Sequence, residues 1–245
     1  MARVNLSGIP VDCLDKESKV LGQLLEHLGG ERPFLLTFVN PAAWAIRRRE
    51  ADYLDIPRAF DLVLPDGIGV VQALRWLADP TTERFSFDAS SLYLPLFAAL
   101  HERGASVFVT GAGPGVAERA VAQMRAEFPG VDYRGCRHGY TEREALRQAI
   151  LEADPEVVLC GMGVPHQERF LLSLKAAGYR GIMISCGGFV DQLAGTALLP
   201  GLGRPAGAAL GLASLPRPPA AGGALPCGLT APPPGHPARD APPSA

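Results

Sequence analysis

The chain has 245 residues, of which 47% are hydrophobic and 20% charged, so it can bury the core of one sizeable domain. Its formal net charge of -2 gives no indication of the basic surface that nucleic acids require, and we expect no nucleic-acid partner. The scattered cysteines favour free thiols in a reducing compartment. No apolar stretch has the length of a membrane span or the position of a signal peptide, and we expect neither.

Apolar runs with the length of buried strands recur along the chain, and amphipathic helical patterns separate them. The strand-like runs cover residues 34–39, 61–65, 105–111, 156–161 and 181–188. The helical patterns cover residues 17–30, 114–128 and 141–153, and the last opens with a predicted capping box of Thr141 and Glu144. This alternation predicts the α/β class, with a mostly parallel, Rossmann-like sheet that carries helices on both faces.

Ligands of such sheets bind at the carboxyl ends of the strands. Glycines, amides and carboxylates follow all of the predicted strands. In chain order these are Asn40, then Asp66 and Gly67, then Gly111, Gly113 and Gly115, then residues 161–168, and finally residues 187–191. Their convergence predicts a ligand site at one edge of the sheet.

Several of these features have a second interpretation. The stretch "VTGAGPGVAERA" is either an anion-binding loop at a helix N-terminus or only a tight strand-to-helix connection. Asp66 is either the N-cap of the helix that follows it or a general base at a strand end. The stretch "HQERF" either contacts a ligand or starts a helix, with Glu168 complementing the helix dipole. No second histidine stands at ligand spacing from His166, so we expect no metal site.

Taken together, several segments resemble the WecG/TagA/CpsF family, also classified as glycosyltransferase family 26. The resemblance runs from about Gly8 to Gly195, and its most specific segments are "LPDGIGVV" and "GMGVPHQE". It implies an inverting transferase that moves a sugar from a UDP-sugar onto a polyprenyl-diphosphate-linked saccharide. Such reactions build precursors of exopolysaccharides and other cell-surface polymers. The resemblance implies no cofactor. It implies a cytoplasmic enzyme that associates peripherally with the inner membrane, and it is compatible with a homo-oligomer.

The resemblance also implies roles for individual residues. Asp66 matches the proposed general base, which takes a proton from the attacking sugar hydroxyl. Asn40 matches an asparagine near the acceptor. The family threonine two residues before that asparagine is Phe38 here, and Thr37 precedes it by one position. The implied catalytic residues are Asp66, Asn40 and Thr37. The implied substrate-binding residues are Arg84, Asp88, Ser91, Gly111, Gly113, Gly161, Gly163, Gln167, Glu168 and Asp191.

The stretch "RFSFDASSL" departs from the Arg-x-Thr-Gly-x-Asp pattern of many members, and we interpret it as a variant of the same substrate-side segment. The chain therefore divides into a glycosyltransferase domain over residues 1–195 and a low-complexity tail over residues 196–245. The tail contains no aromatic residue and 12 of the 23 prolines, a composition that favours disorder over a packed core.

Members of the family carry an aromatic, arginine-rich appendage in place of this tail. A back-translation of residues 198–210 with chosen codons encodes such a segment when it is read one base later. The hypothesis is a frameshift between Gly195 and Leu198, and its alternative is a natural Pro/Gly-rich tail. The sequence leaves two other functions open: an inactive, truncated remnant that at most binds nucleotide, and a dinucleotide-dependent oxidoreductase. The oxidoreductase requires an intact dinucleotide-binding fingerprint, which the sequence lacks.

Overall fold

The computed structural model describes residues 2–195, and the predicted tail at 196–245 lies outside them. The strands are β1 (Ala2–Leu6), β2 (Ile9–Cys13), β3 (Phe34–Val39), β4 (Leu62–Pro65), β5 (Ser106–Gly111), β6 (Asp132–Arg137), β7 (Val157–Gly161) and β8 (Ile182–Ser185). The helices are α1 (Glu17–His27), α2 (Ala42–Arg47), the 3-10 helix η1 (Ala51–Leu54), α3 (Asp55–Arg58), α4 (Ile68–Leu77), α5 (Tyr93–Arg103), α6 (Val116–Glu127), α7 (Arg143–Ala153), α8 (His166–Ala176) and α9 (Phe189–Gly195).

Six strands form one sheet in the order β4-β3-β8-β7-β5-β6, and every neighbouring pair is parallel. Each of the predicted strands lies in this sheet, which confirms the predicted α/β class. β6 is an additional strand at one edge. Successive strands run parallel because the helices between them return the chain to the end of the sheet at which each strand begins.

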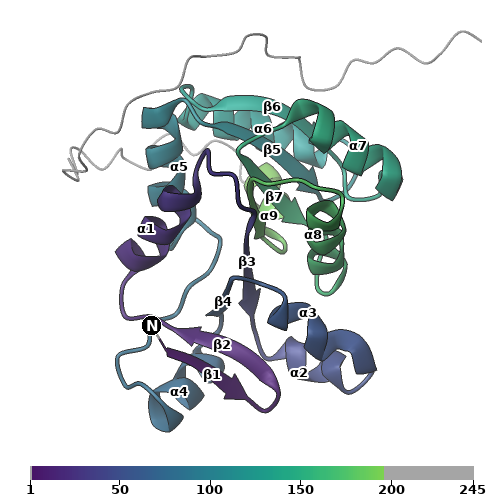
Figure 1. Ribbon diagram of the computed structural model, residues 1–245. Helices are drawn as coiled ribbons and strands as arrows, with labels where there is room; N and C mark the ends of the chain where they lie inside the picture. Colours follow the sequence, from purple (N-terminus) through teal and green to yellow (C-terminus); the bar gives the residue numbers. More distant parts are fainter. Residues whose placement is uncertain (1, 196–245) are drawn as a thin grey trace, which may run out of the picture.

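Helices cover both faces of the sheet (Figure 1). Alternate strand residues face opposite sides, so Leu36 and Leu159 pack in one core, whereas Leu35 and Val158 pack in the other. The first core also contains apolar residues of α1, α5, α6 and α9, and the second contains those of α2, α3, α4, α7 and α8. Because both faces are buried, the inner strands of the sheet are mostly apolar.

The β1–β2 hairpin lies beside edge strand β4 (Figure 1) and joins it through a buried carboxylate. Asp12 of β2 is fully buried, and its Oδ2 accepts a hydrogen bond of 2.8 Å from the backbone nitrogen of Val63. Arg3 of β1 pairs with the same carboxylate at 2.7 Å. Both partners compensate for the desolvation of Asp12, and the hairpin covers the edge of the sheet at β4.

The predicted capping box at Thr141 is wrong. The N-cap of α7 is Glu142, whose carboxylate accepts hydrogen bonds of 2.9 and 2.8 Å from the backbone nitrogens of Glu144 and Ala145. A carboxylate can satisfy two free backbone N–H groups at a helix N-terminus, and its negative charge also favours that position.

Candidate functional site

A cavity of about 180 Å³ opens at the carboxyl ends of β3, β4 and β8. Its lining residues are Phe38, Asn40, Asp66, Ser86, Phe87, Asp88, Val164, Gln167, Ser185, Cys186, Gly187, Gly188, Phe189 and Gln192. Four of the predicted site residues, namely Asn40, Asp66, Asp88 and Gln167, are therefore brought together in one cavity from segments that are far apart in sequence.

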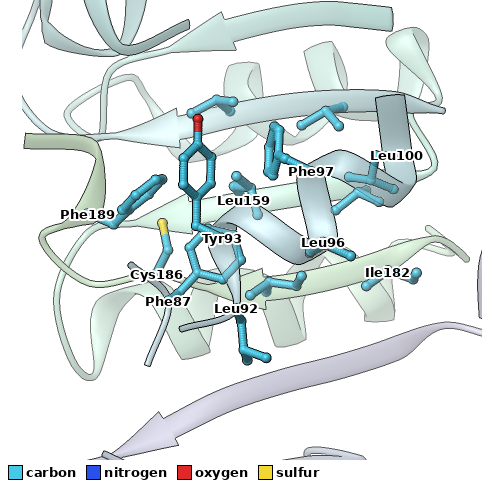
Figure 2. Close-up of a cluster of buried hydrophobic side chains, with 14 of the residues drawn as sticks. Phe87, Leu92, Tyr93, Leu96, Phe97, Leu100, Leu159, Ile182, Cys186 and Phe189 are labelled. Atoms are coloured by element: carbon cyan, nitrogen blue, oxygen red, sulfur yellow. The ribbon is translucent and has the colours of Figure 1, made fainter. Parts of the chain in front are cut away.

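Aromatic residues form one wall of this cavity and continue into the core. Phe87 and Phe189 contact each other with ring centroids 5.1 Å apart, and each also contacts Tyr93 of α5. Figure 2 shows Tyr93 between Phe189 and Phe97, with Cys186 nearby. This wall is the edge of a packed aromatic cluster, so its side chains are fixed by their neighbours.

Asp66 lies between β4 and α4, with its side chain 32% exposed. It is not the N-cap of α4: the N-cap is Gly67, which adopts a φ of 95° and has no side chain to cap with. The Asp66 carboxylate instead pairs with the Arg84 guanidinium at 3.3 Å. Burial raises the pKa of Asp66, and the charge of Arg84 partly offsets that rise. The structure thus leaves Asp66 available as a base.

Asp88 organises the loop that carries Arg84. Its Oδ2 accepts a hydrogen bond of 2.7 Å from Ser86, and its Oδ1 accepts hydrogen bonds from the backbone nitrogen and hydroxyl of Ser90 at 2.8 and 2.6 Å. Burial alone would raise the pKa of Asp88, but the hydrogen bonds from Ser90 and Ser86 outweigh it and hold the pKa below its ordinary value. The Ser91 hydroxyl accepts a hydrogen bond of 3.3 Å from the Ser86 nitrogen, so Ser91 supports this loop without lining the cavity.

Asn40 lies just after β3 and at the start of α2. Its Oδ1 accepts a hydrogen bond of 3.0 Å from the backbone nitrogen of Ala42. This contact uses one lone pair of the side-chain oxygen, so the amide NH2 group of Asn40 is available to donate to a ligand.

Thr37 and Glu168 lie beneath the cavity, and neither lines it. Thr37 Oγ1 donates a hydrogen bond of 3.0 Å to Glu168 Oε1, and the same hydroxyl lies 2.8 Å from the Ser185 hydroxyl. Both residues are almost completely buried, with exposures of 2% for Thr37 and 3% for Glu168. The resemblance implies a catalytic role for Thr37 and a substrate-binding role for Glu168, and the structure places both side chains in a buried polar layer beneath the residues that line the cavity.

Two of the predicted glycines, Gly111 and Gly161, allow close packing of the strand ends. A Cβ atom on Gly111, whose φ is 141°, would lie 2.2 Å from the carbonyl oxygen of Gly161, and one on Gly161 would lie 2.6 Å from that of Gly187. Real Cβ atoms essentially never come this close to another heavy atom. Gly111, Gly113, Gly161, Gly163 and Asp191 do not line this cavity. Close backbone packing therefore explains Gly111 and Gly161 without an anion.

The sequence did not single out Phe38, Ser86, Ser185 or Gln192. Phe38 and Ser185 belong to strands, where an apolar or small residue indicates only burial. Gln192 follows the glycines of "CGGFVDQ", and the helical spacing from Gly188 could have indicated that it faces the same cavity.

Over residues 2–195, no group of three or more histidines, cysteines, aspartates and glutamates is arranged to hold a metal ion. Within the same part of the chain, none of the helices has the length and apolar character needed to cross a membrane.

Comparison with known proteins gives a consistent result. The model of the "Glycosyl transferase WecG/TagA/CpsF family" matches residues 4–198, which include the whole cavity. The chain is 26% identical over 162 residues to the N-acetylglucosaminyldiphosphoundecaprenol N-acetyl-beta-D-mannosaminyltransferase of Bacillus subtilis (strain 168), a match that covers 66% of the chain and 62% of that relative. The chain thus spans less than two thirds of the Bacillus protein.

Two further relatives are matched over more of their length. The UDP-Gal:alpha-D-GlcNAc-diphosphoundecaprenol beta-1,4-galactosyltransferase of Shigella boydii is 26% identical over 190 residues, covering 76% of the chain and 78% of the relative. An N-acetylglucosaminyldiphosphoundecaprenol N-acetyl-beta-D-mannosaminyltransferase of Staphylococcus aureus (strain NCTC 8325 / PS 47) is 24% identical over 202 residues, covering 79% of the chain and 78% of the relative.

Proposed function

Because the chain belongs to the WecG/TagA/CpsF family of glycosyl transferases, we propose that it transfers a sugar from a UDP-sugar to a saccharide carried on polyprenyl diphosphate. The relatives named above transfer an N-acetylmannosaminyl or a galactosyl group to a GlcNAc-diphosphoundecaprenol acceptor. The donor is thus a UDP-hexose or UDP-N-acetylhexosamine, and the product is a precursor of a cell-surface polymer.

The observation that carries this proposal is the carboxylate of Asp66 at the cavity. A sugar hydroxyl is a weak nucleophile until a base takes its proton, and a carboxylate within hydrogen-bond reach can do so in the transition state. Burial raises the pKa of Asp66 and makes the carboxylate a stronger base than an exposed aspartate. Asp88 is the other carboxylate among the residues that line the cavity, and its pKa is lowered, which makes it a weaker base than Asp66.

In the proposed reaction the sugar is transferred in a single displacement step. The acceptor hydroxyl oxygen forms a bond to the anomeric carbon of the donor sugar, and its proton passes to Asp66. The bond between that carbon and the diphosphate oxygen breaks, and UDP leaves with the electron pair. Attack from the face opposite the leaving group inverts the configuration at the anomeric carbon. Asn40 and Gln167 present amide groups to the cavity, where they can orient sugar hydroxyls.

We further propose that the enzyme works at the cytoplasmic face of a membrane, because its proposed acceptor is a lipid. Ile68, Trp76 and Leu77 of α4 are exposed by 63%, 88% and 59%, and α4 begins two residues after Asp66. Exposed apolar side chains on a helix that starts at the cavity are suited to contact with a lipid surface. A homo-oligomer remains a prediction, and gel filtration of the purified protein tests it.

The function is tested by incubating the purified full chain with a synthetic GlcNAc-diphosphoryl-prenol and a panel of UDP-sugars. The proposal expects a disaccharide-lipid product and release of UDP with one donor. A protein that binds UDP but forms no product with any donor would instead be the nucleotide-binding remnant considered above.

A further inference from the structure

Gln167 has a fixed orientation at the cavity, and its neighbours determine it. The backbone nitrogen of Gly187 donates a hydrogen bond of 3.1 Å to Gln167 Oε1. Because a backbone N–H can only donate, the side-chain atom facing Gly187 must be the oxygen. The amide nitrogen of Gln167 therefore faces the other way, where it donates a hydrogen bond of 2.8 Å to Glu168 Oε1.

The same atom of Glu168 serves a second donor. Thr37 Oγ1 also donates to Glu168 Oε1, at 3.0 Å. Since the Thr37 hydroxyl has one hydrogen and gives it to Glu168, the hydrogen bond between Thr37 and Ser185 runs from Ser185, which lines the cavity. One oxygen of Glu168 thus fixes the direction of the hydrogen bonds of two cavity residues, Gln167 and Ser185.

We propose that Glu168 is a positioning residue: its Oε1 fixes the amide of Gln167 and the hydroxyl of Ser185 for the ligand without itself contacting substrate or transferring a proton. The residue is 3% exposed and does not line the cavity, so substrate has no direct access to it. An amide NH2 group has two hydrogens, and Glu168 uses one of them. The second N–H of Gln167 is a donor for an oxygen of the bound ligand.

The other oxygen of Glu168 supports a role as neutral acceptor rather than as charge. Oε2 is buried and has no hydrogen-bond partner among the described residues. A buried carboxylate oxygen without a partner is costly when it carries charge, and less so in the neutral acid. Burial raises the pKa of Glu168 by more than the hydrogen bonds from Gln167 and Thr37 lower it, so the neutral acid is less disfavoured here than in an exposed glutamate. The carbonyl oxygen of a neutral acid still accepts hydrogen bonds.

Two substitutions at this position separate the acceptor from the charge. Glu168→Gln keeps an acceptor oxygen and cannot ionise, so kcat/KM should remain within about threefold of the unsubstituted enzyme. Glu168→Leu removes the acceptor at similar volume and should lower kcat/KM by about 10- to 100-fold, the effect expected when a buried hydrogen-bonding group loses its partner. Equal loss in both variants would show that the charge or a proton is required, and full activity of Glu168→Leu would show that Oε1 is not needed.

A double substitution tests whether Glu168 acts through Gln167. If it does, Glu168→Leu should cost little further activity in a Gln167→Ala background, whereas multiplied losses would overturn the proposal. The thermal midpoint of each variant is measured as well. If Glu168→Leu acts only by destabilising the fold, the midpoint should fall equally with and without Gln167→Ala. Glu144→Gln, an exposed first-turn glutamate of α7, is the matched control and should change neither quantity.

The identity of the ligand rests on the proposed function, but the orientation of Gln167 can be measured without turnover. In a nitrogen-15 NMR spectrum, the side-chain NH2 signals of Gln167 are identified by their loss in Gln167→Ala. One hydrogen should exchange slowly with solvent in the unsubstituted protein and in Glu168→Gln, and both should exchange fast in Glu168→Leu. Fast exchange in all three proteins would overturn the positioning role. If one hydrogen of the Gln167 amide exchanges slowly but the protein transfers no sugar, the proposed function is wrong and the positioning role stands.

Discussion

Arg84 and Asp88 act on Asp66 in opposite directions from the same loop. The guanidinium of Arg84 lies 3.3 Å from the Asp66 carboxylate and lowers its pKa, whereas the negative charge of Asp88 raises it. Burial has the largest effect and leaves the pKa of Asp66 above its ordinary value. The loop thus holds a cation and an anion whose balance adjusts the basicity of the proposed catalytic residue.

Replacing Arg84 should move the acid limb of the pH–rate profile to higher pH. Asp66 acts as a base only when it is ionised, so activity falls as pH decreases through its pKa. Arg84→Gln removes the cation that lowers this pKa, and the limb should therefore shift upward. The measurement is kcat/KM against pH. A limb that stays in place would show that another group controls it.

Replacing Asp88 should shift the same limb in the opposite direction. Asp88→Asn removes a negative charge near Asp66, so the pKa of Asp66 should fall and activity should persist to lower pH. Asparagine retains an oxygen that can accept hydrogen bonds from Ser86 or Ser90, which limits rearrangement of the loop. Shifts of the same sign in Arg84→Gln and Asp88→Asn would indicate a structural change rather than electrostatics.

Replacing Asp66 itself should remove most of the activity. Asp66→Asn keeps the size of the side chain but cannot take a proton, and kcat should fall by about 10²- to 10⁴-fold, the usual contribution of a general base. The KM for the donor should change little, because the proposed role concerns the acceptor hydroxyl. Asp55→Asn, an exposed aspartate of α3 outside the cavity, is the control. A kcat for Asp66→Asn within threefold of the control would exclude Asp66 as the base.

Much of the sheet could be predicted because parallel strands buried on both faces are apolar along their length. β6 was missed because its sequence, "DYRGCR", mixes charged and small residues, although Tyr133 and Cys136 are buried. Asp132 and Arg134 pair with each other at this edge of the sheet, where charged side chains reach solvent. Local hydrophobicity alone therefore does not reveal an edge strand.

Part of the candidate site could be predicted from the residues that follow the strands. Asn40 and Asp66 follow their strands directly, and residues in that position of a parallel sheet reach the same edge. The depth of a side chain at that edge depends on neighbouring elements, which no short motif specifies. Gln167 and Glu168 are adjacent in sequence, yet one lines the cavity and the other lies beneath it, since successive helical residues point about 100° apart.

Replacing Gly111 should destabilise the fold rather than weaken a ligand contact. In Gly111→Ala the new Cβ would meet the Gly161 carbonyl oxygen at 2.2 Å, in a backbone conformation that alanine rarely adopts. Strain and steric overlap of this kind should lower the free energy of unfolding by roughly 2–4 kcal/mol. Urea denaturation measures it. Gly69→Ala in α4, where a Cβ meets nothing within 4 Å, is the control and should be neutral or stabilising. Equal stability of both variants would contradict the packing explanation.

Trp76 should report contact with lipid. The chain has two tryptophans, and Trp44 is half-buried with its Nε1 donating a hydrogen bond to the Leu6 carbonyl oxygen, whereas Trp76 is 88% exposed. In a Trp44→Phe variant the fluorescence arises from Trp76 alone. If α4 contacts the membrane, adding vesicles of phosphatidylglycerol and phosphatidylethanolamine should shift this emission to shorter wavelength, because the indole leaves water.

Removing the apolar side chains should separate lipid contact from chemistry. Trp76→Ser combined with Leu77→Ser should abolish co-flotation of the protein with these vesicles, because about 1.5–3 kcal/mol of transfer free energy is lost with each large apolar side chain. Turnover of an acceptor with a short, water-soluble prenyl chain should stay within about twofold, since the substituted residues lie at the far end of α4 from Asp66. Unchanged flotation would assign membrane contact to another surface. If turnover of the soluble acceptor falls as much as flotation does, these residues support the fold of the site rather than its contact with lipid.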